Sequence, residues 1–368
     1  KHDLKRRIYF DEAAREHWRQ LVEKLLARKN PYTGMTTLQD PALLGVITVN
    51  EGGINHLAAQ REAWPPLLKD AFNVWLKEHY GGDDALRRAW RTLADSERTD
   101  KRSVELPSKL RDRTPRMRDV QRFITGLETE AAQWMTAHLR GLGYEGLVTG
   151  LDSWPSRQAD LSRRTFEWID MHGYHDENFG FGPGVRMRQS SALDNDGRYL
   201  RWLAAARQRG KPYSVTEYGQ PFWNQYRYEA SLMGPAMASL QQWDFVCMHA
   251  EGAIDLSLKQ TVSRKAAIHP YGLGVDPVTI SGETLAAVML RRGDIAPAKR
   301  KALINFSGAE FAGEPVDIIE DELSTMSWLT RVELAVSQKA ADGTGYDAIF
   351  GVGAQPQTPP RRVPGKPP

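Results

Sequence analysis

The chain has 368 residues, 41% hydrophobic and 26% charged, an ordinary globular composition that suits one large domain or two medium ones. The formal net charge of +3 is too small to indicate a nucleic-acid partner, and the single cysteine excludes an intramolecular disulfide. No run of apolar residues is long enough to predict a membrane span, and no signal peptide is recognisable. The first residues are typical of the middle of a domain, so we expect a fragment of a longer protein.

The first part of the chain is predicted to be mainly helical. Residues 11–29 have apolar side chains at helical spacing, with acidic residues in the first turn and basic residues in the last. The β-prone stretch 46–49 runs into Asn50 and Glu51, which predicts a buried strand that ends on a carboxylate. Half of residues 91–120 are charged, and we interpret them as a solvated surface insertion. Further helices are expected at 64–80, from Asp83 onward, and at 118–140.

Strands and helices alternate from residue 146 onward. Strands are predicted at 146–154, 168–177, 212–222 and 243–252, and helices at 195–209, 226–241 and 281–292, the last capped by Ser281. This alternation is typical of βαβ units and a parallel sheet. In such sheets the chemistry lies at the carboxyl ends of the strands.

Polar and aromatic side chains stand at each of these predicted strand ends. They are Asn50 and Glu51, Asp152 and Trp154, His172 and Tyr174, Glu217 and Tyr218, and His249 and Glu251. Two of the ends present a glutamate, and paired carboxylates across a cleft are the minimum equipment for cleaving a glycosidic bond. The pattern therefore points to a glycosidase.

On these residues the chain resembles the clan A glycoside hydrolases over roughly residues 8–295. Asn50-Glu51 matches the motif that ends strand four in that clan, and Glu217 matches the glutamate that ends strand seven. The stretch "WLKEHYGGDDALRRAW" is similar to a segment of β-galactosidase-like and agarase-like members, and "IDMHGYH" resembles their strand six.

The resemblance implies a role for each matching residue. Glu51 would be the acid/base, Glu217 the nucleophile of a retaining mechanism, and Asn50 a ligand of the sugar 2-hydroxyl. His172 and Tyr174 would steady the nucleophile. The chemistry of their side chains adds further candidates for substrate binding, namely Asp152, Trp154, Tyr218, Trp223 and His249. For its role as an acid, Glu51 is expected to have a raised pKa.

The implied fold is an α/β (β/α)8 TIM barrel of which only strands four to eight are present. We expect residues 1–295 to form this partial catalytic domain and residues 296–355 an accessory or barrel-flanking segment. Residues 356–368 are rich in proline and are expected to be a disordered tail.

The leading hypothesis is a retaining glycosidase that acts on β-linked oligo- or polysaccharides without a cofactor or a resident metal. One alternative is a truncated or inactive barrel that only binds carbohydrate. The other is a metal-dependent hydrolase that uses His172, His175, Asp176 and Glu177. The sequence leaves open the sugar, the linkage, exo or endo action and the oligomeric state. A polysaccharide substrate would imply a secreted or periplasmic protein.

Overall fold

The computed structural model describes residues 2–109, 114–153, 155–176, 180, 186–249, 271, 276–307, 319, 321–337, 339 and 341–352. Four predictions fall outside these residues: the substrate-binding role of Trp154, the metal-binding role of Glu177, the strand end with Glu251 and the disordered tail at 356–368. Among the helices of the described part, none is both long enough and apolar enough to cross a membrane.

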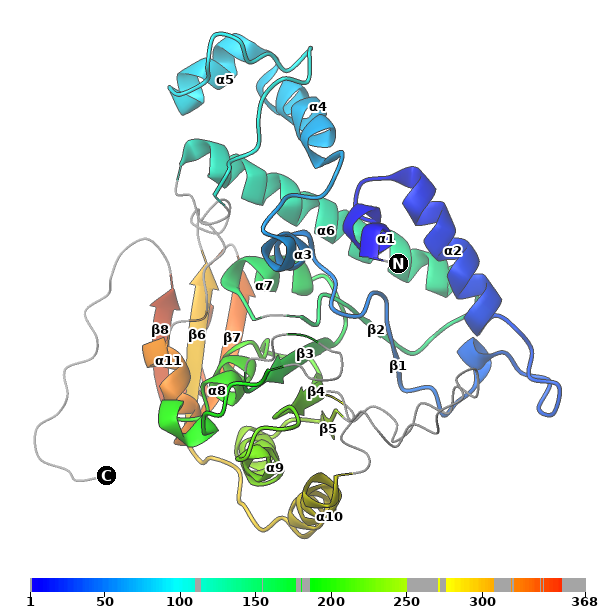
Figure 1. Ribbon diagram of the computed structural model, residues 1–368, viewed down its shortest axis with the longest axis vertical. Coiled ribbons are helices and arrows are strands. Elements are labelled where there is room, and N and C mark those ends of the chain that lie inside the picture. Colours follow the sequence, from blue (N-terminus) through cyan, green and yellow to red (C-terminus); the bar gives the residue numbers. More distant parts are fainter. Residues whose placement is uncertain are drawn as a thin grey trace, which may run out of the picture.

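The N-terminal half is built mainly of helices (Figure 1). They are α1 (His2–Arg7), α2 (Glu12–Leu26), α3 (Ile54–Arg61), α4 (Leu68–Tyr80), α5 (Asp83–Trp90) and α6 (Pro115–Gly141), with a 3-10 turn η1 (Thr37–Gln39). The predicted helices at 11–29, 64–80 and 118–140 are confirmed, whereas α1 and α3 were not predicted. Helix α6 begins earlier than expected because Pro115 takes its first position and the Thr114 hydroxyl accepts from Met117 N–H.

An aromatic cluster holds α4, α5 and α6 together. The Phe72 ring is fully buried, and its centroid lies 5.9 Å from that of Trp75, 6.3 Å from Trp90 and 5.5 Å from Phe123. Such pairs contribute beyond their buried area. The cluster is therefore a main source of stability for the helical half.

We expect Phe72→Ala to lower the free energy of unfolding by about 3–5 kcal/mol, because it removes a large buried side chain and leaves a cavity. Val74→Ala on the same helix is the control, since Val74 is 41% exposed and its loss should change stability little. Urea unfolding followed by tryptophan fluorescence measures both variants. Equal midpoints for the two would contradict this account of the cluster.

The charged segment 91–120 is less solvated than its composition predicts. Val104 is fully buried, and the Glu97 carboxylate accepts two hydrogen bonds from Arg116 at 2.8 and 2.7 Å. Glu97 also accepts the backbone N–H groups of Ala94 and Glu105. Paired charges and a buried valine fasten this segment to α6.

The C-terminal half alternates strands and helices. Its elements are β2 (Leu147–Thr149), α7 (Arg157–Arg163), β3 (Ile169–Tyr174), η2 (Ala192–Asn195), α8 (Arg198–Ala205), β4 (Tyr213–Gly219), η3 (Arg227–Glu229), α9 (Ala230–Gln241), β5 (Phe245–Met248) and α10 (Pro277–Arg292). Each predicted strand and helix of this region is present, and α7 is an additional helix. Helix α10 begins before Ser281, because Asp276 caps it by accepting from Thr279 N–H.

The strands that carry the candidate residues are parallel. Strand β1 (Gly45–Ile47) pairs with β2, and β3, β4 and β5 form a second sheet in that order. The two sheets adjoin where His172 N–H donates to the Asp152 carbonyl at 2.7 Å. The predicted α/β fold with parallel strands is confirmed, and the described strands on their own do not close into a barrel.

A third parallel sheet follows, with strand order β7-β6-β8 (Figure 1). Its strands are β6 (Lys301–Ser307), β7 (Arg331–Ser337) and β8 (Ala348–Val352). The helix α11 (Asp321–Thr325) and the 3-10 turn η6 (Met326–Trp328) lie between β6 and β7 in the chain. The sequence analysis expected an accessory or barrel-flanking segment here and did not predict that it would form a parallel sheet. Ile304 and Leu334 belong to the same buried core as residues of β3 and β4. Strand β7 contacts α8 and α9, which in turn contact β3 and β4, so helices join the third sheet to the second.

Candidate active site

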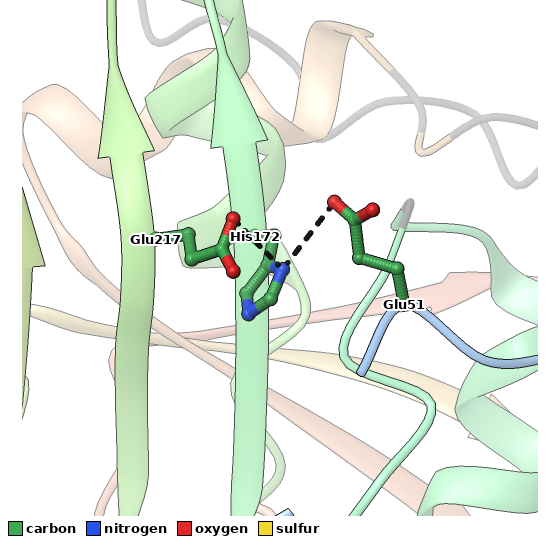
Figure 2. A group of neighbouring side chains, drawn as sticks. All are labelled: Glu51, His172 and Glu217. Atoms are coloured by element: carbon green, nitrogen blue, oxygen red, sulfur yellow. Dashed lines mark hydrogen bonds and ion pairs between the residues drawn. The ribbon is translucent and has the colours of Figure 1, made fainter. Parts of the chain in front are cut away.

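The candidate site lies where two hydrophobic cores meet. One core includes Val49 and Leu151, beside the ends of β1 and β2, and the other includes Met171 and Val215 from β3 and β4. Glu51 and Asp152 therefore stand on one side of the junction, and His172 and Glu217 on the other. Figure 2 shows the His172 ring between the two glutamates.

One ring nitrogen of His172 faces both glutamates. Its Nδ1 lies 3.5 Å from Oε1 of Glu51 and 3.5 Å from Oε2 of Glu217 (Figure 2). One carboxylate oxygen of each glutamate and a ring nitrogen of His172 all lie within 4.8 Å of one another. The His172 side chain is 3% exposed, against 35% for Glu51 and 19% for Glu217, so the ring is buried beneath two partly open acids.

The other ring nitrogen faces acceptors deeper in the protein. Nε2 of His172 lies 3.1 Å from the Thr216 hydroxyl oxygen, 3.5 Å from Oδ2 of Asp152 and 3.6 Å from Oδ2 of Asp170. The Thr216 hydroxyl donates its own hydrogen to Asp170, so its oxygen is left to accept from His172. Both carboxylates are fully buried. Nε2 therefore carries a hydrogen in each protonation state of the ring.

The backbone at Glu51 is fixed in an unusual conformation. Glu51 has a φ of +48°, which is uncommon for a residue with a side chain. Its N–H donates to Oδ1 of Asp152 at 2.6 Å, and the Ser153 hydroxyl donates to the next carbonyl, that of Gly52, at 2.7 Å. Asp152 and Ser153, which follow β2, thus hold the turn that carries Glu51.

The charges around His172 set the protonation of the group. Burial opposes a charged ring, but Glu51, Asp152, Glu217 and Asp170 outweigh it and raise the pKa of His172 to about 9. Burial raises the pKa of Asp152 to about 7. The hydrogen bond from His172 lowers the pKa of Glu51, where the sequence analysis expected a raised value. The expectation was wrong because it did not foresee a cation beside this carboxylate.

Glu217 has further donors on its other side. The Tyr174 hydroxyl donates to Oε2 of Glu217 at 2.5 Å, and Nδ1 of His249 lies 3.8 Å from the same oxygen. Burial and the charge of Glu217 raise the pKa of Tyr174, so its hydroxyl stays protonated and remains a donor. Tyr271 packs edge-on against Tyr174 with ring centroids 4.9 Å apart. These contacts hold the Glu217 carboxylate in a fixed position.

A cavity of about 450 Å³ opens beside these groups. Its lining includes Glu51, His172 and Tyr174, and it extends past His56 to Trp202 on α8. This volume is within the range of small-molecule sites. Glu51 thus borders a space that a sugar can enter, and Glu217 lies next to it across His172.

The remaining predicted residues lie in different surroundings. Asn50 is exposed, and its backbone carbonyl accepts from Lys5 at 2.5 Å. Trp223 is 66% exposed and stacks on Phe222. Tyr218 lies away from the predicted site: it is buried against Gly234 of α9, because successive side chains of a strand point to opposite faces. The predicted role of Tyr218 in substrate binding is therefore corrected.

The sequence analysis missed Asp170, Thr216 and His56. Asp170 stands two residues before His172 on the same strand, and Thr216 directly precedes Glu217. The period of two in a strand places Asp170 and His172 on one face, a signal that could have identified the aspartate. His56 follows Glu51 by five residues, and burial lowers its pKa to about 4. No sequence pattern marked it.

Within the described residues, two groups have ligand atoms close enough for a metal ion. They are Glu51, His172 and Glu217, and Asp152, Asp170 and His172. The metal site predicted around His175 and Asp176 is not one of them, since both residues bond to Ser190. A metal needs a bare imidazole nitrogen, whereas both nitrogens of His172 face acceptors and its pKa is about 9. The surroundings of His172 therefore suit a protonated ring better than a metal ligand.

Solved structures with a similar fold are β-galactosidases. The chain aligns with the enzyme from the psychrophilic Marinomonas ef1 at a TM-score of 0.50 and 13% identity, covering 95% of this chain and 56% of that one. The alignment with the enzyme from the Antarctic haloarchaeon Halorubrum lacusprofundi has a TM-score of 0.53 and 17% identity, and it covers 93% of this chain and 52% of that one. The alignment with Gan42B, a GH42 β-galactosidase from G. stearothermophilus, has a TM-score of 0.55 and 15% identity, and it covers 92% of this chain and 50% of that one. The chain therefore shares the fold of these β-galactosidases over the part of them that it covers.

The chain spans about half the length of these structures. The sequence matches no protein-family model and no curated protein. At such low identity the similarity establishes the fold, and the chemistry has to be argued from the site itself.

Proposed function

We propose that the chain is a glycoside hydrolase that cleaves β-glycosidic bonds with retention of configuration, using Glu51 as acid/base and Glu217 as nucleophile. The main observation in support is the approach of the two carboxylates, which have oxygens within 4.8 Å of each other beside the cavity. Carboxyl groups about 5–5.5 Å apart are typical of retaining enzymes, and wider pairs about 6.5–9.5 Å apart leave room for the water of an inverting one.

In the first step, Glu217 attacks the anomeric carbon and a proton passes through Glu51 to the departing oxygen. Glu217 suits the role of nucleophile because the Tyr174 hydroxyl donates to its carboxylate and His172 lies 3.5 Å from the same oxygen, so the group is held in place. Glu51 suits the other role because it borders the cavity and is the more exposed of the two. A glycosyl ester on Glu217 results.

In the second step, Glu51 takes a proton from a water molecule, which attacks the ester and releases the sugar. The ionised form of Glu51, which His172 favours, is the form that this step needs. Asn50 and Trp223 are proposed as further substrate contacts, and His249 as a support for Glu217.

The neighbours suggest a substrate class. The similar structures are β-galactosidases, so β-galactosides are the first substrates to test. We propose residues 1–295 as the catalytic part and 296–355 as a segment that flanks it. Because the chain spans about half of its neighbours, the full substrate range is part of the proposal.

The test is the stereochemistry of hydrolysis. Nitrophenyl β-galactoside is hydrolysed with the 368-residue chain, and proton NMR records the anomer that forms first. We expect the β anomer, which then mutarotates. First release of the α anomer would contradict the double displacement. Galactoside binding in calorimetry without turnover would favour the binding barrel, and activity lost to a chelator and restored by zinc would favour the metal-dependent hydrolase.

A further inference from the structure

Glu51 presents a chemical problem for the proposed function, on which this inference rests. An acid catalyst must deliver a proton, but the hydrogen bond from His172 lowers the pKa of Glu51 and keeps it ionised at rest. The proton in this group instead resides on His172, whose pKa is about 9. The site therefore stores its proton one residue away from the acid that faces the cavity.

The geometry determines which proton of His172 can move. The Nε2 hydrogen is held by the Thr216 hydroxyl oxygen, with the Asp152 and Asp170 carboxylates behind it. The Nδ1 hydrogen faces the cavity side, at 3.5 Å from both Glu51 and Glu217. When the ring becomes neutral it keeps the Nε2 hydrogen, so Nδ1 is the nitrogen that releases and regains a proton.

The two glutamates are not equivalent as acceptors of that proton. Oε2 of Glu217 already accepts the Tyr174 hydroxyl at 2.5 Å and has His249 nearby. Among the residues that the structure describes, no tyrosine donates to Oε1 of Glu51, and the backbone of Glu51 is fixed by Asp152. The competing donors at Glu217 direct the Nδ1 proton toward Glu51.

We propose that His172 stores the proton that Glu51 passes to the leaving group, and that Asp152 is the positioning residue that keeps this proton on the ring. Oδ1 of Asp152 fixes the backbone of Glu51. Oδ2 is a buried oxygen for which the described residues offer no hydrogen-bond partner, and it lies 3.5 Å from Nε2 of His172. One carboxylate thus orients the residue that delivers the proton and stabilises the ring that holds it.

The bonds balance in both steps. During glycosylation the Nδ1–H bond of His172 breaks, and the proton passes through Glu51 to the leaving oxygen. That oxygen takes the electron pair of the glycosidic bond as Glu217 bonds to the anomeric carbon. During deglycosylation water bonds to this carbon, its proton returns through Glu51 to Nδ1, and Glu217 leaves as a carboxylate. Glu51 is ionised before and after each step.

Formation of the ester assists the cycle. Glu217 loses its negative charge when it bonds to the sugar, which removes one of the groups that hold the proton on His172. The other charged or titratable groups around the ring and its two glutamates belong to several elements. They are Lys5 (α1), Glu51 (after β1), His56 (α3), Asp152 (after β2), Asp170 and Tyr174 (β3), and His249 (after β5). His56 does not compete for the proton, because burial lowers its pKa to about 4.

The consequence is an activity that extends to alkaline pH. His172 has a raised pKa, so the ring is protonated below about pH 9 and loses its proton as the pH rises through that value. For a substrate that needs protonation, kcat/KM should hold up to about pH 8 and fall above it. A glutamate acting without His172 would lose activity at a lower pH.

The test is Asp152→Asn, whose amide oxygen can still accept the Glu51 N–H but which no longer carries a charge. With a β-linked galactose disaccharide, we expect the alkaline limb of the kcat/KM pH profile to move to a pH lower by about one unit or more. At pH 8, kcat/KM should fall about 10-fold. With dinitrophenyl β-galactoside, whose leaving group needs no proton, kcat/KM should fall much less than with the disaccharide. A misfolded variant would lose both activities.

Two further measurements keep the inference separate from the proposed function. NMR titration of isotope-labelled histidine, assigned with His172→Gln, should give a His172 pKa of about 9 in the unaltered chain and a lower one in Asp152→Asn. Asp119→Asn removes another buried carboxylate, hydrogen-bonded to Tyr80 and Trp90, and should move neither the His172 pKa nor the alkaline limb. A ring that titrates near about 6.5 in both proteins overturns the inference. If the unaltered chain cleaves neither substrate, the proposed function fails and the titration still decides on His172.

Discussion

Replacing Glu217 by alanine should lower kcat for nitrophenyl β-galactoside by about 10⁴-fold or more, because the variant has no group that can form the glycosyl ester. The Glu217 side chain is 19% exposed, so a small anion can reach the space that the carboxylate leaves. Azide or formate should therefore restore part of the activity. Azide would attack from the face that Glu217 had occupied, and the product should be the α-galactosyl azide.

The rescue distinguishes loss of a nucleophile from loss of structure. Glu78→Ala serves as the control, since Glu78 is an exposed glutamate on α4, distant in sequence from the site, and its loss should leave kcat unchanged. Thermal unfolding of both variants checks the fold. Full activity of Glu217→Ala without added anion would remove Glu217 from the mechanism and end the case for a double displacement.

The sequence was sufficient to predict that the two glutamates lie close together, because each follows a recognisable β-prone stretch. Val46–Val49 and "PYSVT" are apolar or β-branched runs, and Glu51 and Glu217 are the first carboxylates after them. Parallel strands bring such ends to one edge of a sheet. This topological rule places residues 166 positions apart in one neighbourhood without any knowledge of the side-chain packing.

The electrostatics of the site could not be predicted in the same way. Whether Glu51 has a raised or a lowered pKa depends on which ring nitrogen of His172 points at it and on the buried carboxylates behind that ring. Those contacts depend on the packing of β2 against β3 and on a register shift between Met171 and His172. Propensity and periodicity carry no information on such a shift.

Tyr218 shows that sequence position alone can also place a residue in the site that the structure places elsewhere. It stands next to Glu217 in the sequence and seemed equally suited to the site, but strand alternation turns it into the core beside Gly234. Tyr174, on the neighbouring strand, donates to Glu217 instead. In a strand, the residue that supports a catalytic group is therefore better sought on the adjacent strand than at the next position in the chain.

Glu51→Ala should produce a different defect from Glu217→Ala. With the disaccharide we expect kcat/KM to fall by about 10²–10⁴-fold, because no group passes a proton to the leaving oxygen. With dinitrophenyl β-galactoside the ester on Glu217 should still form, but water is no longer activated, so a burst of dinitrophenol precedes a slow steady state. Rapid-mixing absorbance measures the burst and the steady state.

Azide then separates the two roles by the configuration of the product. In Glu51→Ala the ester on Glu217 is intact, so azide attacks it from the face that Glu51 had occupied and yields the β-galactosyl azide. In Glu217→Ala the same anion yields the α product, since it replaces the nucleophile. The opposite products from one reagent follow only if the two carboxylates lie on opposite faces of the sugar, which is the arrangement proposed for Glu51 and Glu217 about His172. If both variants gave the same anomer, this assignment of roles would have to be abandoned.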